Sequence, residues 1–351
     1  MKEFEIAGRK VGGDAPCFII AEAGSNHDRN FDQALRLIDV AVDASADAVK
    51  FQVFSADEIA ARTTDKIASL EGDQFGAYGK DLHELYKKVE LPIEWFPELK
   101  KYADAKGILF TATPFHEGAV DLLEKIDVPF YKIASFELVH LPLIRYAAKT
   151  GKPIILSTGM ATMEEIDEAL AVLKEVGNEK YAFLHCGIGY PPQMEDINLA
   201  AMDTMRDHLG CPIGYSDHTL GITIPIAAVA RGAKLYEKHF TCDKTLTGPD
   251  HHFALDPDEL KGMVQAIRDV EKATGSSLKR PTSSEQLHLQ RGRRSLFAKQ
   301  SIPAGTVLTE DMIAVLRPGI GLKPKYMKEV LGKKAMRDIM VYEPLQLDLF
   351  Q

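Results

Sequence analysis

The chain has 351 residues, of which 45% are apolar and 26% charged, a composition typical of folded globular proteins that excludes extensive disorder. The 42 basic and 51 acidic residues give a net charge of −9, which disfavours binding to nucleic acid through bulk charge. No apolar run approaches the roughly 18 residues of a membrane span, no signal-peptide pattern opens the chain, and the scattered cysteines suggest no disulfide framework. We therefore expect a cytoplasmic protein with no membrane or nucleic-acid partner.

Short apolar runs alternate with segments of helical period along most of the chain. Eight runs are predicted to be strands: 18–24, 48–54, 109–115, 131–135, 153–159, 181–190, 212–218 and 235–241. Helices are predicted at 31–45, 94–106, 117–125, 163–176, 222–231 and 257–273, whereas the link around 199–208 is less clearly periodic. Eight successive strand–helix units favour an α/β fold of the (β/α)8 or TIM-barrel type over an open doubly wound sheet.

The end of the chain departs from this pattern. Residues 276–294 are polar, basic and poor in large apolar side chains, which predicts a linker after a barrel over 1–275. Residues 295–351 contain short β-like runs separated by turns and are predicted to form a small β-rich module. A module of about 55 residues has a marginal core of its own, so we expect it to dock onto something larger.

Polar side chains gather near the carboxyl ends of the predicted strands. They are Glu22, Lys50, Gln52, Thr113, Ser135, Glu137, Ser157, Ser216, His218 and His239. In a (β/α)8 barrel these ends share one face, where barrel enzymes have their active sites. The pattern therefore predicts an active-site rim.

The last two predicted strands end at His218 and His239, and neighbouring strands would direct both imidazoles into the same opening. Two imidazoles, completed by water or substrate oxygens, form an open site for a divalent metal that acts as a Lewis acid. A structural pair bonded to Asp217 or Glu237 is the alternative, and the shared rim favours the metal. Other histidines near this face remain alternative ligands: His27, His185, His251 and His252.

Lys50 and Lys132 lie within apolar strands, where a buried ammonium group is costly unless it is paired. Hydroxyl groups end the neighbouring strands, and with the lysines they form a predicted cradle for phosphate or carboxylate. These hydroxyls belong to Ser135, Ser157, Thr158 and Ser216. Two alternatives are structural pairing of the lysines with Glu22 and Glu137, and a Schiff base with pyruvate as in lysine-type aldolases. Either glutamate could also bind sugar hydroxyls or transfer a proton.

Eight motifs then occur in a characteristic order: IAEAGSNH (20–27), VKFQ (49–52), YKIASFE (131–137), ILSTGM (155–160), YSDHTLG (215–221), EKHFT (237–241), TGPDH (247–251) and RPGIGL (317–322). Over essentially its whole length the chain resembles the N-acetylneuraminate (sialic acid) synthase family, which includes pseudaminate, legionaminate and spore-coat polysaccharide relatives. The C-terminal module resembles the antifreeze-like (SAF) domain of that family.

The resemblance implies that phosphoenolpyruvate condenses with the open-chain aldehyde of an N-acetylated hexosamine such as N-acetylmannosamine. The products are a nine-carbon 2-keto acid and phosphate. Pseudaminate and legionaminate relatives instead use a 2,4-diacetamido-6-deoxy sugar. The resemblance further implies that His218 and His239 hold a divalent metal, most often manganese, and that Glu137 completes the catalytic set.

By the same resemblance, phosphoenolpyruvate would be bound by Lys50, Lys132, Ser135, Ser157 and Ser216. The sugar would be bound by Glu22, Gln52, Tyr190, Asp250 and Arg317. Arg317 would come from the partner subunit of a homodimer with exchanged C-terminal modules.

The sequence departs from the family pattern in one strand. Residues 187–189 read Gly-Ile-Gly, where sialic-acid-type members carry a Thr–Asn or Thr–Ser pair, so a side-chain donor is lost that backbone amides could replace. The SFE motif (135–137) is closer to pseudaminate synthases, whereas GPDH (248–251) is closer to sialate and legionaminate synthases. We expect the insertion at 55–88 to contact the sugar. A non-catalytic sugar-binding protein is the alternative from another class.

Overall fold

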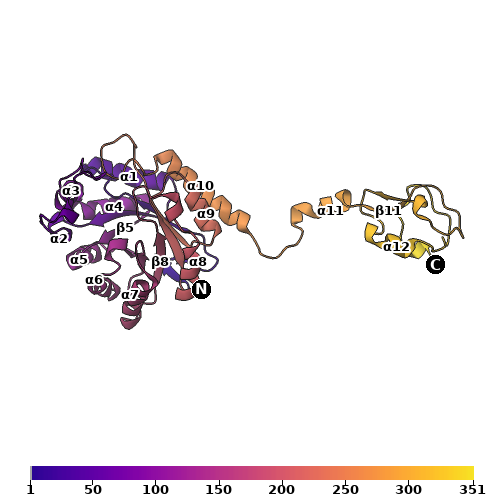
Figure 1. Cartoon of the computed structure of the whole chain (residues 1–351), viewed down its shortest axis with the longest axis horizontal. Helices are drawn as coiled ribbons and strands as arrows, with labels where there is room; N and C mark the ends of the chain where they lie inside the picture. Colours follow the sequence, from indigo (N-terminus) through magenta and orange to yellow (C-terminus); the bar gives the residue numbers. More distant parts are fainter. Residues whose placement is uncertain (1) are drawn as a thin grey trace. The chain divides into compact units, whose positions relative to one another are not determined.

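The computed structural model describes residues 2–351. They fall into two compact units, Met1–Gly275 and Ser276–Gln351 (Figure 1). Each unit has its own buried core.

The first unit is built around eight parallel strands, which Figure 1 shows surrounded by helices. The strands are β3 (Phe18–Glu22), β4 (Ala48–Val53), β5 (Leu109–Pro114), β6 (Tyr131–Ile133), β7 (Ile154–Ser157), β8 (Tyr181–Cys186), β9 (Ile213–Asp217) and β10 (Leu235–His239). Hydrogen bonds join them in the order β5-β4-β3-β10-β9-β8-β7-β6. Because β5 also contacts β6, and the Thr111 hydroxyl donates a 2.6 Å hydrogen bond to the Phe130 carbonyl, the sheet closes. The predicted barrel and its eight strands are confirmed.

Helices follow the strands in the manner of a (β/α)8 barrel. They are α1 (Phe31–Asp43), α4 (Phe96–Lys106), α5 (Glu117–Lys125), α6 (Leu141–Ala148), α7 (Met163–Glu175), α8 (Ala201–Leu209), α9 (Thr223–Ala230) and α10 (Pro257–Thr274). Capping boxes begin α7 at Thr162 and α10 at Asp256 and satisfy the first backbone amides of each helix. The sequence analysis missed α6, which is short and follows the β6 strand after a single 3-10 turn, η3 (Ser135–Glu137).

The insertion after β4 contains two short helices, α2 (Ala56–Ile59) and α3 (Leu82–Val89), with the 3-10 turn η1 (Lys66–Ala68) between them. Another 3-10 turn, η2 (Ile93–Trp95), leads into α4, and η4 (Met194–Asp196) lies between β8 and α8.

Each barrel strand contributes to two cores, because successive side chains point to opposite faces of a strand. In β8, Ala182 and Leu184 lie in the barrel interior, whereas Tyr181 and Phe183 pack against the surrounding helices. The larger, outer core joins the strands to the helices. This division matters for the site, because inward side chains near the carboxyl ends of the strands face the barrel opening.

A small hairpin closes the amino-terminal end of the barrel. Strands β1 (Phe4–Ile6) and β2 (Arg9–Val11) pair antiparallel, and Phe4, Ile6 and Val11 join the interior core. Strands of three residues carry too little alternation to be recognised from sequence, so the hairpin was not predicted.

The second unit is described separately. It contains η5 (Ser283–Glu285), α11 (Gln286–Gly292), β11 (Ser295–Ala298), η6 (Glu310–Met312), β12 (Ile313–Leu316), η7 (Pro324–Tyr326), α12 (Met327–Val330) and η8 (Leu347–Leu349). The β11 and β12 strands pair antiparallel, and isolated bridges such as Ile302–Ile339 connect the remaining turns around a common core. The predicted linker at 276–294 includes the α11 helix, and the β-rich module is confirmed. Among residues 2–351, no helix combines the length and apolarity needed to cross a membrane.

The hairpin should stabilise the barrel measurably. Ile6 is 0% exposed. We expect Ile6→Ala to lower the free energy of unfolding by about 2–5 kcal/mol, because it leaves a cavity in the interior core. Urea unfolding followed by the fluorescence of Trp95, the single tryptophan of the chain, reports on the first unit. The control is Ile67→Ala, at a position that is 90% exposed, and an equal effect of the two changes would contradict the role of the hairpin.

Candidate functional site

The carboxyl ends of β3, β4 and β10 carry a buried network of charged side chains. The ammonium group of Lys50 lies 2.8 Å from Glu22 Oε2 and donates a 3.0 Å hydrogen bond to the Thr113 hydroxyl. The Gln52 amide donates a 2.7 Å hydrogen bond to the other oxygen of Glu22. The predicted pairing of Lys50 with Glu22 is therefore present, and it places two predicted site residues beside the lysine.

A second lysine lies on β6, separated from Lys50 on β4 by the single strand β5. Lys132 Nζ donates hydrogen bonds to Ser157 Oγ (2.6 Å) and to the Ile133 carbonyl (3.0 Å). It lies 3.7 Å from Glu237 Oε1, which is also 3.8 Å from Lys50 Nζ. Glu237 thus connects the two lysines, and the predicted pairing of Lys132 with Glu137 is not found as an ion pair among the described residues.

Glu237 is a site residue that the sequence analysis did not select. Besides the two lysines it accepts a 3.2 Å hydrogen bond from the Ser216 hydroxyl, on the neighbouring β9 strand. The sequence did contain one indication that Glu237 belongs to the site. It lies two residues before His239, so both side chains are on the same face of β10. Its Oε2 atom is buried without a hydrogen-bond partner in the described part of the chain.

Burial and neighbouring charges change the protonation behaviour of this network. Burial, reinforced by the charge of Glu237, raises the pKa of Glu22 to about 7 despite the opposing effect of Lys50. Burial also lowers the pKa of Lys132, whereas the two carboxylates raise that of Lys50 against the effect of burial. Perturbed groups clustered at a barrel opening are typical of a functional site.

The two histidines lie together, as predicted. The centroids of the His218 and His239 rings are 5.2 Å apart, and both residues are 7% exposed. His218 Nδ1 is 3.0 Å from the carbonyl oxygen of Gly187. Neither ring is hydrogen-bonded to Asp217 or Glu237 among the described residues, so the particular structural partners considered for the pair are not the ones the structure shows.

The loop after β3 approaches His239 closely. Gly24 has φ +52°, and a Cβ atom there would lie 2.9 Å from His239 Nδ1 and 2.7 Å from Asp250 Oδ2, so this position requires glycine. Asp250 Oδ2 lies 3.7 Å from His239 Nδ1 and accepts a 3.0 Å hydrogen bond from the Ser25 amide. Asp250 is therefore beside the histidine pair, as predicted.

The pair fits a divalent metal ion. The hydrogen bond from His218 Nδ1 to a carbonyl leaves Nε2 as its ligand atom and fixes the ring, an arrangement typical of metal-bound histidine. His239 Nδ1 is buried without a hydrogen-bond partner among residues 2–351, and burial together with the nearby His218 lowers its pKa well below the usual value. Its ring is therefore neutral, the form that binds metals. No group of three or more His, Cys, Asp or Glu side chains suited to a metal occurs in the described chain, so water and substrate would complete the coordination.

The other candidate histidines make structural contacts instead. His27 Nδ1 accepts from the Arg29 amide, and His185 Nε2 is 2.8 Å from the Ile197 carbonyl. His251 lies between Asp28 and Thr241, and His252 Nε2 is 3.1 Å from the Tyr190 carbonyl.

Aromatic rings form one wall of the opening. The Tyr190 ring lies 4.6 Å from that of His218, and the Phe253 ring lies 5.1 Å from that of His239. Phe253, which the sequence analysis did not select, also contacts Tyr190 at 5.5 Å. The insertion after β4 reaches this wall, because Phe75 packs against Tyr190 with ring centroids 6.2 Å apart. The Tyr190 and Phe253 rings cover one side of the histidine pair.

The η3 turn carries two predicted site residues. The Ser135 hydroxyl accepts a 3.0 Å hydrogen bond from the Gly159 amide, which holds it beside the end of β7. The Oε2 atom of Glu137 is buried without a hydrogen-bond partner within residues 2–351, and burial raises the pKa of this carboxyl to about 7. Glu137 can therefore exchange a proton near neutral pH.

Arg317 lies in the second unit, directly after β12. It is exposed and forms no hydrogen bond or ion pair with any residue that the structure describes. Its neighbours Leu316 and Ile320 are also exposed, at 39% and 55%.

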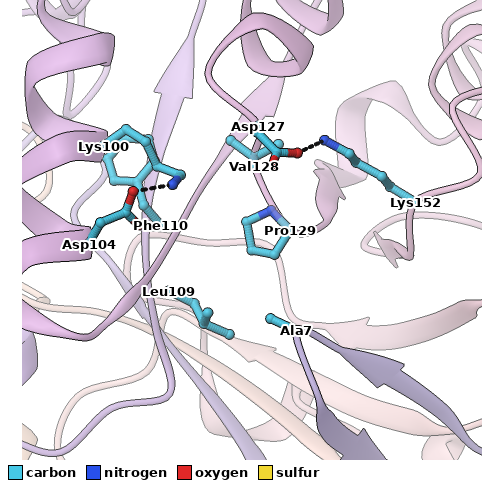
Figure 2. A pocket seen from close by; sticks show the side chains of 9 residues that line it. All are labelled: Ala7, Lys100, Asp104, Leu109, Phe110, Asp127, Val128, Pro129 and Lys152. Atoms are coloured by element: carbon cyan, nitrogen blue, oxygen red, sulfur yellow. Dashed lines mark hydrogen bonds and ion pairs between the residues drawn. The ribbon is translucent and has the colours of Figure 1, made fainter.

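A separate pocket of about 400 Å³ lies at the amino-terminal end of the barrel, away from the strand ends described above (Figure 2). Its lining consists of Ala7, Lys100, Asp104, Leu109, Phe110, Asp127, Val128, Pro129 and Lys152. Lys100 pairs with Asp104, and Lys152 Nζ lies 2.8 Å from Asp127, as the dashed lines in Figure 2 mark. Because its charges are paired and this end of a barrel serves stability, we assign it no catalytic role.

Comparison with known proteins identifies the family. Residues 37–279 match the NeuB family and residues 293–350 match the SAF domain. The chain is 42% identical to the spore coat polysaccharide biosynthesis protein SpsE of Bacillus subtilis, covering 97% of this chain and 95% of SpsE. It is 38% identical to the N,N'-diacetyllegionaminic acid synthase of Legionella pneumophila, covering 93% and 94%.

A solved structure gives the same result. The N-acetylneuraminic acid (sialic acid) synthetase of Leptospira borgpetersenii, crystallised with citrate, superposes with a TM-score of 0.73 at 38% identity, covering 82% of this chain and 95% of that one. The chain therefore belongs to the NeuB family of nonulosonic acid synthases, phosphoenolpyruvate-dependent condensing enzymes, with a C-terminal SAF domain.

Proposed function

We propose that this enzyme condenses phosphoenolpyruvate with an N-acetylated hexosamine, with N-acetylmannosamine as the first candidate, to give a nine-carbon 2-keto acid and phosphate. The observation that carries the proposal is that a buried histidine pair lies beside a buried two-lysine cradle at the same barrel opening. An anion receptor next to a Lewis-acid site is what this condensation needs.

Phosphoenolpyruvate would bind through the ammonium groups and the surrounding hydroxyls. These groups belong to Lys50, Lys132, Ser135, Ser157 and Ser216. Glu237 now contacts both lysines at 3.7–3.8 Å, beyond normal hydrogen-bond length, so both ammonium groups keep donors for the oxygens of the substrate. The cradle would thus hold the enol carbon against the sugar aldehyde.

His218 and His239 would hold the divalent metal, most often manganese in this family, which supplies Lewis-acid polarisation of the aldehyde oxygen. The sugar would be oriented by the Glu22–Gln52 pair, by Asp250 beside His239 and by the Tyr190 ring. As C3 of phosphoenolpyruvate forms the new bond to the aldehyde carbon, water adds at C2 and phosphate leaves from C2. Glu137 would take a proton from that water as it adds and deliver a proton to the oxygen of the former aldehyde, roles that its pKa of about 7 supports.

The acceptor sugar is the open part of the proposal. Legionaminic acid synthases match this chain at 38–40% identity and a sialic acid synthetase matches it at 38%, so the identity does not separate the two acceptors. A 2,4-diacetamido-6-deoxy sugar of the pseudaminate or legionaminate type is therefore the alternative acceptor. Residues 187–189 contribute a backbone carbonyl to His218 rather than a side-chain donor to the substrate, so these positions do not favour either sugar.

We also propose a homodimer in which the C-terminal module of each subunit supplies Arg317 to the other barrel. Apolar side chains are exposed on consecutive loops after β6, β7, β8 and β9: Phe136, Met160, Met194 and Leu220. The exposed Leu316 and Ile320 flank Arg317 and suit such a surface. The guanidinium would then bind the carbonyl oxygen of the N-acyl group.

The four cysteines are free thiols in the structure, and three of them are buried. This state fits a reducing compartment, which supports a cytoplasmic location for the enzyme.

Phosphate release from phosphoenolpyruvate tests the reaction and identifies the sugar. We expect manganese-dependent, chelator-sensitive release with one of three acceptors: N-acetylmannosamine or either 2,4-diacetamido-6-deoxy sugar. His218→Ala should lower the rate on the order of 100-fold or more, because the metal loses one of its two protein ligands. The control is His208→Ala, an exposed histidine that pairs with Asp167 on the outer helices. Full activity of metal-stripped enzyme would refute the metal site, and borohydride trapping with pyruvate would favour an aldolase.

The raised pKa of Glu137 makes stability depend on pH. The carboxyl titrates at about 7 in the folded protein and at an ordinary 4.5 when unfolded, so its cost to stability grows between these values and is complete above them. We expect Glu137→Gln to raise the midpoint of thermal unfolding at about pH 8 more than at about pH 5, in metal-free protein. Glu168→Gln, at an exposed helix position, is the control. An equal effect at both pH values would contradict the buried, proton-exchanging carboxyl.

Mixed dimers test the exchange of Arg317. The experiment co-expresses a His218→Ala chain and an Arg317→Ala chain that carry different affinity tags. Each variant alone should be inactive at limiting sugar concentration. Purification through both tags isolates the mixed dimers. In each mixed dimer one barrel would be intact and would receive Arg317 from the partner, so about half of wild-type activity per mixed dimer is expected. No recovery of activity would show that Arg317 acts within its own chain or not at all.

A further inference from the structure

A second buried ion pair lies behind the histidines, on the outer face of the same two strands. Lys238 Nζ is 2.7 Å from Asp217 Oδ2, and both side chains are 0% exposed. The strand register places Lys238 directly opposite Asp217, in β10 and β9. Neither residue has a part in the proposed substrate or metal contacts.

The pair cannot face the barrel opening. Successive side chains of a strand point to opposite faces, and Ser216 and Glu237, which contact the lysine cradle, occupy the inner face. Asp217 and Lys238 therefore point outward, on the same side as Tyr236, which belongs to the outer core. His218 and His239 follow these two residues directly in the chain.

Every partner of the pair belongs to the same short segments. The Tyr236 hydroxyl donates a 2.5 Å hydrogen bond to Asp217 Oδ2, and the Thr219 amide donates a 2.8 Å hydrogen bond to Asp217 Oδ1. Lys238 Nζ donates to the carbonyl oxygen of Thr219. The network therefore holds the residues on both sides of His218 and the residue before His239.

A buried ion pair is weak evidence for a contribution to stability, because the loss of hydration offsets the attraction between the charges. What such a pair does supply is a fixed geometry, since the charges are satisfied in only one arrangement of the strand ends. Here the strand ends so joined carry the two imidazole rings, whose centroids are 5.2 Å apart.

We propose that Asp217 and Lys238 are positioning residues for the metal site: they join the ends of β9 and β10 so that His218 and His239 can bind one divalent cation. The inference rests on the proposed metal site and concerns residues that would not touch the metal. Partners that orient metal ligands from outside typically change metal affinity about 10- to 100-fold when they are altered.

The test measures Mn²⁺ binding directly, by the electron paramagnetic resonance signal of free Mn²⁺ during titration of metal-free protein. The double variant Asp217→Asn/Lys238→Met removes both charges, so that neither is left buried without a partner. We expect its dissociation constant for Mn²⁺ to rise about tenfold or more, while phosphoenolpyruvate binding to metal-free protein stays within about twofold. An unchanged Mn²⁺ constant in the folded double variant would overturn the proposal.

Two further proteins make the result decisive. Ile6→Ala weakens the barrel at its other end and should leave Mn²⁺ affinity unchanged. If Ile6→Ala also lowered Mn²⁺ affinity, the loss in the double variant would be explained by general destabilisation, and the proposal would fail. If the double variant does not fold, Tyr236→Phe removes a single donor to Asp217 and should weaken Mn²⁺ binding in the same direction. Its failure to do so would equally refute the proposal. Wild-type protein that binds no Mn²⁺ would refute the metal site itself, a distinguishable outcome.

Discussion

The site depends on burying four charges within the opening of one barrel. Lys50, Lys132, Glu22 and Glu237 are each at most 5% exposed, and burial of ammonium and carboxylate groups is tolerated only when they are paired and hydrogen-bonded. The parallel strands meet this requirement, because their register fixes which side chains oppose each other across neighbouring strands. The two ammonium groups are offset by two carboxyl groups, one of which, Glu22, has a pKa raised to about 7. A metal cation and an anionic substrate can then enter together without a large change in total charge.

The two faces of the β9 and β10 strands have different roles. Inward side chains contact ligands and must remain available, whereas outward side chains form the ion pair and join the core under the helices. Because the two sets alternate residue by residue, a ligand-binding group is never more than one residue from a group that fixes the backbone. This explains how a site built at strand ends, next to long loops, can keep two imidazole rings at a fixed separation.

The sequence allowed much of this to be predicted, for identifiable reasons. The eight strands carry continuous apolar runs, and the alternation of strands and helices defines the barrel, so the histidine pair and Lys50–Glu22 could be expected at one rim. Three features required the structure. Glu237 was overlooked because it lies close to the histidines in the sequence, which suggested that it pairs with a histidine. In the structure it lies instead between two lysines that come from other strands of the barrel. Phe253 reaches the site from an irregular loop, and the β1–β2 hairpin is too short to show a period. Long-range packing, rather than local pattern, decides all three.

The bond from His218 to the Gly187 carbonyl has a consequence for how this enzyme can diverge. A main-chain oxygen is present whatever the residue, so this support does not depend on any side chain of the segment after β8. Gly189 is nevertheless fixed as glycine, because its φ is +141° and a Cβ atom there would lie 2.6 Å from Pro192 Cα. A substitution at Ile188, between the two glycines, can therefore change the side chain at this point while the histidine keeps the same hydrogen-bond partner.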